Sequence, residues 1–193
     1  MNLICGIDEA GRGPLAGPVC AAAVILGKSF PHDILADSKT LSCSSREKAR
    51  QFIFTESVAF GIGWASNVEI DEINILRASL LAMKRAFDEM LFQYKTFFDV
   101  KALCNIEVIV DGLYVPDISF PCRAVVKADS KFPEVMAASI LAKTARDRIM
   151  EVYSCFYPEY GYEKHKGYPT KAHRAVIAQY GPSPIQRNTF RVK

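Results

Sequence analysis

The sequence predicts a mixed α/β domain, in which a five-stranded sheet is flanked by helices and followed by a small C-terminal extension of helix and loop. The length of 193 residues is that of one domain, so residues 1–193 are expected to form a single unit. Half of the residues are apolar and 23% are charged, as in an ordinary globular chain. Short β-branched runs also alternate with stretches of helical periodicity.

Five short apolar runs rich in β-branched residues predict the strands of the sheet. They cover residues 3–7, 19–26, 58–65, 106–110 and 124–126. Polar or turn-forming segments separate these runs, so each is expected to be a separate strand.

Apolar spacings of three and four predict a long helix after Ser66, where Ser66 and Glu69 form the pattern of a capping box. Ser44 and Glu47 form a second candidate capping box ahead of another helix. Pro133 suits the first turn of a third helix, because proline needs no hydrogen-bond acceptor there.

Residues 157–193 form the predicted C-terminal extension, which is expected to be mostly loop because Gly and Pro recur along it. One short helix is predicted over residues 171–180. Residues 161–193 carry seven Lys or Arg and one acid, whereas the net charge of the whole chain is only +3. Such a basic segment favours contact with a polyanion such as nucleic acid, and a solvated basic surface is the alternative.

Several other classes of protein are excluded by composition. The longest charge-free stretch, residues 13–27, is 15 residues long, and a bilayer-spanning helix needs about 20. Residues 1–7 carry no basic segment and acids follow at once, so we expect no secretory signal and a cytoplasmic protein. The six cysteines are scattered without the short spacings that bind zinc, which favours reduced thiols.

Acidic residues follow three of the predicted strands: Asp8 and Glu9 the first, Asp111 the fourth and Asp129 the fifth. The carboxyl ends of neighbouring strands border one crevice in an open α/β sheet, so these four carboxylates are predicted to meet. Crowded acids repel one another unless a divalent cation neutralises them, and oxygen ligands suit Mg²⁺ or Mn²⁺. A pair of such ions promotes hydrolysis of a phosphodiester. For each acid taken singly, ending a strand or capping a helix is the alternative.

The first pair of acids opens directly into a glycine-rich turn formed by Gly11, Arg12 and Gly13. Glycines let backbone N–H groups approach a ligand closely, so this turn is a candidate binding loop. A plain tight turn would explain the glycines but not Arg12, whose alternative role is an ion pair with a neighbouring acid.

Residues 7–19, with the sequence IDEAGRGPLAGPV, resemble the signature of type 2 ribonuclease H, the family of bacterial ribonuclease HII. Further matches follow in the family's order along the chain. They are residues 37–39 (DSK), Asn74 with residues 78–83, residues 110–112 (VDG), residues 137–143 with Arg146 and Asp147, residues 166–168 (KGY) and residues 187–190 (RNTF). The related type 3 enzymes have a different glycine motif and a Glu as the last acid, so Arg12 and Asp129 favour type 2.

The resemblance implies the ribonuclease H-like fold and a site with two divalent ions, Mn²⁺ or Mg²⁺. The metal-binding catalytic acids that it implies are Asp8, Glu9, Asp111 and Asp129. It also implies substrate-binding residues, with the glycine motif reading the ribose 2′-hydroxyl at an RNA–DNA junction and the tyrosine stacking on the sugar beyond it. These residues are Gly11, Arg12, Gly13, Lys39, Lys143, Lys166 and Tyr168.

Three positions depart from the family's usual pattern, and the basic tail contains two histidines. Ala128 replaces a Gly before the last acid, a change expected to shift the Asp129 backbone slightly without removing a metal ligand. Gln186 replaces a common His and Thr40 a frequent Lys, and both changes are expected to affect substrate binding rather than chemistry. His165 and His173 are candidates for contacting phosphate or moving a proton, and an incidental surface position is the alternative.

The expected activity is hydrolysis of the phosphodiester 5′ to a ribonucleotide, in RNA–DNA hybrids and at single ribonucleotides in duplex DNA, leaving 3′-hydroxyl and 5′-phosphate ends. Its expected role is removal of misincorporated ribonucleotides and RNA primers, by a monomer with no obligate protein partner. Three alternatives stay open: a silent nucleic-acid-binding module, another metal-dependent nuclease such as a junction resolvase, and a metal-independent acid–base hydrolase.

Overall fold

The computed structural model describes residues 3–35, 43–98 and 106–191 and shows the predicted mixed sheet between helices. The strands are β1 (Leu3–Ala10), β2 (Val19–Leu26), β3 (Ser57–Ala65), β4 (Ile106–Asp111) and β5 (Cys122–Val125). The helices are α1 (Cys43–Glu56), α2 (Asn67–Phe97), α3 (Pro133–Phe156), α4 (Tyr162–His165) and α5 (Lys171–Tyr180). The short 3-10 turns are η1 (His32–Leu35), η3 (Ala128–Ser130) and η4 (Pro158–Tyr160).

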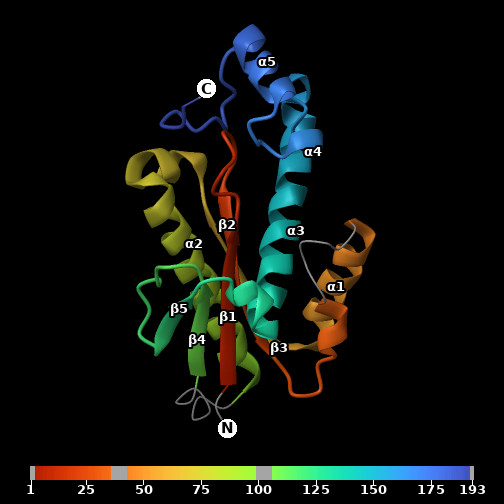
Figure 1. The fold of residues 1–193 in the computed structure, drawn as a ribbon, viewed down its shortest axis with the longest axis vertical. Helices are drawn as coiled ribbons and strands as arrows, with labels where there is room; N and C mark the ends of the chain where they lie inside the picture. The colour runs from red at the N-terminus through yellow and green to blue at the C-terminus, as the bar shows by residue number, and fades with distance from the viewer. Residues whose placement is uncertain (1–2, 36–42, 99–105, 192–193) are drawn as a thin grey trace.

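The sheet has the order β3-β2-β1-β4-β5, with β1 antiparallel to β2 and parallel to β4. Every residue of β2 is buried, and its side chains alternate between two cores. Ala21 and Ala23 face α2, whereas Ala22 and Val24 face α1 and α3 on the other side. Figure 1 shows this layering, with α2 on one side of the sheet and α3 on the other.

Helix α3 approaches β1 very closely at Gly6, two residues before Asp8. A Cβ at Gly6 would lie 2.2 Å from the backbone nitrogen of Val135, so only glycine fits in this part of β1. The first turn of α3 therefore rests directly on the strand. Pro133 occupies the first turn of this helix, as predicted.

The capping box at the start of α2 is confirmed. The Ser66 amide donates to Glu69 Oε2 at 2.8 Å, and the Glu69 amide donates to Ser66 Oγ at 3.2 Å. The expected continuous helix is interrupted at Asn74, which has a φ of 67°. Asn74 Oδ1 accepts from the Leu76 amide at 3.0 Å, so Asn74 caps the segment that follows it.

One expected strand boundary and one expected helix cap were wrong. Strand β1 continues to Ala10, because its pairing with β2 extends past its pairing with β4, so the first two acids lie inside the strand. Helix α1 begins at Cys43, and the Glu47 carboxylate accepts from Arg50 and Arg148 rather than completing a cap with Ser44.

The C-terminal extension contains more helix than predicted. The helix expected over residues 171–180 is present as α5, but α4 and η4 precede it. Among the residues that the structure describes, no helix is long and apolar enough to cross a bilayer.

Candidate active site

Acidic residues lie where the central strands of the sheet end. The pairing of β1 with β4 stops at Ile7 opposite Val110, so Asp8 and Asp111 come next on the two strands. Glu9 follows on β1, opposite Ala21 of β2. The Ala128 amide donates to Asp111 Oδ1 at 2.7 Å and places η3, which carries Asp129, beside β4. The fold therefore brings all four predicted acids to the same end of the central strands of the sheet.

Burial disfavours the ionised forms of two of these acids, Asp8 and Glu9. Asp8 is only 6% exposed, and this burial, together with the neighbouring charges of Glu9 and Asp111, raises its pKa well above the ordinary range. Burial also raises the pKa of Glu9, and the Arg12 guanidinium opposes that effect at 3.4 Å from Glu9 Oε1. A site of this kind stabilises an added cation.

The chemistry of the donor set fits a divalent metal ion, since carboxylate oxygens are the ligands that Mg²⁺ and Mn²⁺ prefer. The burial and mutual repulsion of Asp8 and Glu9 are what such an ion would relieve. In the described segments, no three His, Cys, Asp or Glu side chains are gathered closely enough to hold an ion. The carboxylates would therefore have to draw together around it.

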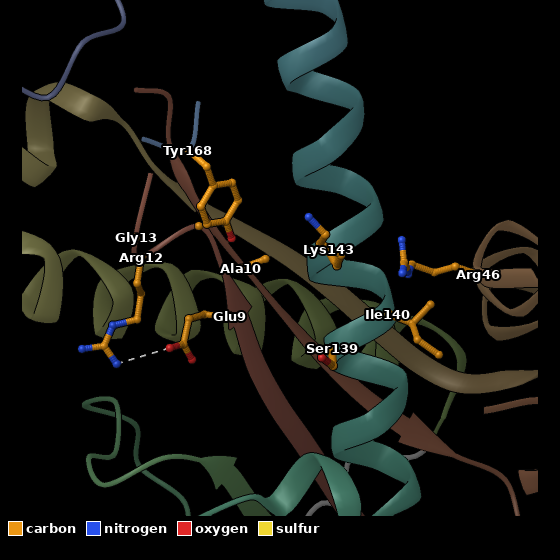
Figure 2. Close-up of a pocket in the computed structure, with 10 residues that line it drawn as sticks. Glu9, Ala10, Arg12, Gly13, Arg46, Ser139, Ile140, Lys143 and Tyr168 are labelled. Atoms are coloured by element: carbon orange, nitrogen blue, oxygen red, sulfur yellow. Dashed lines mark hydrogen bonds and ion pairs between the residues drawn. The ribbon is translucent and has the colours of Figure 1, made fainter. Parts of the chain in front are cut away.

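A pocket of about 480 Å³ adjoins the acids. Gly11, Arg12, Gly13, Lys143 and Tyr168 all line it. Figure 2 shows Arg12, Gly13 and Tyr168 together on one side and Lys143 on α3 across from them. Arg12 also pairs with Glu9, so the alternative that it contacts a neighbouring acid is realised beside its position in the pocket. The structure thus brings five of the seven predicted substrate residues into one cavity.

The predicted lysine contacts differ in their surroundings. The Lys166 ammonium donates to Glu151 Oε1 at 2.8 Å and does not line this pocket. Lys39 and Thr40 lie outside the described residues. Lys143 Nζ contacts Asp147 Oδ1 at 2.8 Å and lies 5.8 Å from the centre of the Tyr168 ring, which is 40% exposed. The tyrosine is therefore partly exposed at the edge of the pocket, beside a cation.

The two histidines of the tail hold the segment that carries the tyrosine. Their rings stack with centroids 4.4 Å apart, and His173 is fully buried. His173 Nδ1 bonds the Tyr168 carbonyl at 3.0 Å, while the Gly167 amide donates to His165 Nδ1 at 3.2 Å. Burial lowers the pKa of both imidazoles. These contacts give the pair a structural role, and the alternative of an incidental surface position is wrong for the buried His173. The expected role in contacting phosphate or moving a proton stays a prediction.

Two buried arginines, which the sequence did not single out for a role, organise the glycine turn. Arg187 and Arg146 are both 0% exposed. Arg187 donates to five backbone carbonyls between 2.7 and 3.1 Å, those of Gly11, Arg12, Pro14, Gly17 and Pro18. Arg146 donates to the carbonyls of Ala16, Pro18 and Lys166. The pair thereby joins the glycine turn to the segment that precedes Tyr168.

Burying two like charges side by side is costly. Burial, and then the charge of Arg146, lower the pKa of Arg187 to about 9. Both arginines belong to matched motifs, but arginine is mostly a surface residue, so only the motif match could have indicated them.

Two of the departures from the family pattern lie near these loops. Ala128 is fully buried against Ile109 and Val135, so its methyl group is accommodated beside the last acid. Gln186 is 5% exposed and forms an isolated bridge with Ala16. In this structure Gln186 therefore supports the glycine turn rather than facing the pocket.

Comparison with known proteins points in one direction. The chain matches the protein family described as Ribonuclease HII over residues 5–193. A protein of Treponema denticola named Ribonuclease HII is 57% identical over 196 residues, which cover 99% of both chains. A chain from the PCNA:RNase HII complex of Archaeoglobus fulgidus has a TM-score of 0.75 at 26% identity and covers 99% of this chain and 96% of its own. A Bst-RNase HIII in complex with Mn²⁺ has the same fold, with a TM-score of 0.75 at 17% identity over 99% of this chain and 68% of its own.

Proposed function

This chain belongs to the ribonuclease HII family of endonucleases, and we propose that it hydrolyses the phosphodiester 5′ to a ribonucleotide, in RNA–DNA hybrids and at single ribonucleotides in duplex DNA. The products are a 3′-hydroxyl and a 5′-phosphate. The cellular role is removal of misincorporated ribonucleotides and RNA primers. The observation that carries the proposal is that Asp8 and Glu9, whose pKa values are raised by burial, adjoin the pocket of the glycine turn, which Glu9 itself lines.

The four acids would hold two divalent cations, Mg²⁺ or Mn²⁺, as is usual in this family of metal-dependent enzymes. They are Asp8, Glu9, Asp111 and Asp129. When bound, such ions supply activation of a water nucleophile and stabilisation of the leaving oxygen. The raised pKa of Asp8 supports this assignment, because a neighbouring cation would restore its ionised form.

The glycine turn would discriminate RNA from DNA. The carbonyls of Gly11 and Arg12 are turned inward to Arg187, and the turn lines the pocket. Backbone N–H groups of such a turn can bind a ribose hydroxyl, which DNA lacks. Tyr168 would stack on the sugar beyond the junction and hold the duplex in register.

The lysines would bind phosphate with different strengths. Lys143 lines the pocket and is the best placed of the described candidates. Lys166 would have to leave Glu151 to reach a phosphate, and Lys39 keeps the role implied by the family motif. Residues 157–193 would add a basic surface along the duplex. We propose that the enzyme acts as a monomer without an obligate protein partner.

The test is cleavage of an end-labelled DNA duplex that contains one ribonucleotide, with an all-DNA duplex as control. Wild type and Asp8→Asn are compared with Mg²⁺, with Mn²⁺ and with EDTA. Incision 5′ to the ribonucleotide that needs a metal and is lost in Asp8→Asn supports the proposal.

Each remaining alternative predicts a different result. Binding without cutting under any metal would support a silent binding module. Equal cleavage of the all-DNA duplex would support another nuclease and remove the role of Arg12 and Tyr168 in sugar discrimination. Activity that persists in EDTA would support a metal-independent hydrolase.

A further inference from the structure

An exposed apolar ridge lies directly after the acid at the end of β4. It consists of Leu113, Tyr114 and Val115, whose side chains are 74%, 54% and 43% exposed. Three consecutive large apolar side chains in solvent are costly, and contiguous patches of this kind often mark an interaction site.

The exposure of the ridge does not result from a lack of core to pack against. Later in the same loop, Ile118 and Phe120 pack against the core between the sheet and α2, and Phe120 stacks edge-on against Phe87 with ring centroids 5.2 Å apart. The Lys84 ammonium donates to the Asp117 carbonyl at 2.9 Å and fixes the loop to α2. The loop is thus anchored behind the ridge, while the ridge itself stays open.

The backbone before the ridge directs it outward. Gly112 has a φ of +116°, a conformation that favours glycine, and nothing lies within 4 Å of the position of a Cβ there. Its amide donates to the Val125 carbonyl at 3.2 Å, so the turn is held to β5. This geometry sets Leu113 and Tyr114 immediately beside Asp111.

The ridge is continuous with the candidate active site. Leu113 and Tyr114 border a small notch of about 20 Å³, which Glu9, Arg12 and Asp111 also line. Glu9 and Arg12 belong as well to the larger pocket that Tyr168 borders. The Glu9–Arg12 ion pair therefore stands between two cavities, one with Tyr168 at its edge and one with Tyr114 at its edge.

We propose that this ridge is a substrate-binding surface, which contacts the duplex on the opposite side of the scissile phosphate from Tyr168. This inference rests on the proposed function. A duplex that crosses the Glu9–Arg12 pair from the larger pocket meets Leu113 and Tyr114 next. The occupant is the minor groove, since ribose hydroxyls are displayed there and apolar side chains pack against sugars or wedge between base steps.

The experiment uses the double variant Leu113→Ser/Tyr114→Ser, which keeps the loop anchors and all four acids. We expect KM for the ribonucleotide duplex to rise about tenfold with kcat nearly unchanged, because the variant loses stacking or apolar contact with a nucleotide. A tenfold change corresponds to about 1.4 kcal/mol. Phe92→Ser is the matched control, since Phe92 is 70% exposed on a distant turn of α2. Thermal unfolding of the variants checks that each folds as wild type does.

Shortened substrates locate the contact. Duplexes are trimmed step by step on the 5′ side of the scissile phosphate, away from the nucleotides assigned to Tyr168. We expect wild type to lose affinity with trimming until it equals the double variant, whose own KM changes little. Trimming on the 3′ side should weaken both proteins equally.

Three results would overturn the proposal: an unchanged KM for the double variant, a defect of equal size on fully trimmed duplexes, or a fall in kcat alone, which would indicate disturbance of Asp111. Failure of the proposed function gives a different result, because wild type would then leave every ribonucleotide duplex uncut. In that case duplex affinity, measured by fluorescence anisotropy without metal, still tests the ridge directly.

Discussion

Replacing Arg187 by lysine tests whether one buried guanidinium holds the glycine turn. The guanidinium donates hydrogen bonds of 2.7 to 3.1 Å to five backbone carbonyls. A lysine ammonium has only three donors. At least two buried carbonyls therefore lose their partner, at about 1–3 kcal/mol each. The expected loss of unfolding free energy is about 2–6 kcal/mol. For a chain of 193 residues, this corresponds to a fall of about 4 °C or more in the unfolding midpoint.

The assay is thermal unfolding followed by circular dichroism, together with urea unfolding at 25 °C. Arg174→Lys is the matched control, because Arg174 is exposed on α5 and its replacement is expected to change stability by less than about 0.5 kcal/mol. Under the proposed function, Arg187→Lys should also raise KM for a ribonucleotide duplex. An Arg187→Lys protein that unfolds at the wild-type midpoint would refute this account of the turn.

Three further predictions concern pH, the acids and salt. Burial lowers the pKa of His173 below 6.5, so at acid pH the unfolded chain binds more protons than the folded chain. The contribution of His173 to the free energy of unfolding is therefore complete above about pH 6.5 and is lost as the pH falls below it. Urea unfolding at pH 7.5 and 5.5 should show a smaller loss of unfolding free energy in His173→Gln than in wild type. The raised pKa of Asp8 means that its ionised form destabilises the fold at neutral pH. Asp8→Asn should therefore abolish incision, yet raise the midpoint of thermal unfolding by about 2–4 °C at pH 7 without metal. A lower midpoint would contradict the assignment. Lys143→Ala should reduce the slope of log affinity against log salt concentration by about one counterion. Lys166→Ala should reduce this slope by less, because Lys166 is paired with Glu151. The reverse order would assign the phosphate contact to Lys166.

Features set by neighbouring residues were predictable from the sequence. The Ser66–Glu69 capping box and the proline that begins α3 act within one turn of helix, so their sequence pattern is sufficient. The meeting of the acids was also predictable, because the parallel strands β1 and β4 run side by side toward one edge of the sheet. The end of β1 was not, since its pairing with β2 continues to Ala10 and includes Asp8 and Glu9.

Features that depend on distant contacts could not be predicted. The interruption of α2 at Asn74 involves neither proline nor glycine, and nothing in the local pattern distinguishes it from continuous helix. The burial of Arg146 and His173 depends on carbonyls supplied by the glycine turn and by the Tyr168 segment, which only the folded chain brings to them. Arginine is mostly a surface residue and histidine is intermediate, so residue type alone did not predict that these two side chains are buried.

The contacts of Arg187 also set an order of events during folding. The guanidinium is separated by about 170 residues from the carbonyls that it holds, so these contacts close one of the longest loops in the chain. Contacts of such separation form late, after the sheet and its helices are in place. A nascent chain would therefore contain Asp8 and Asp111 on paired strands before its glycine turn is ordered. Under the proposed function, nucleic acid recognition would be completed only when the C-terminal segment docks, and the enzyme would become selective at the last step of its own folding.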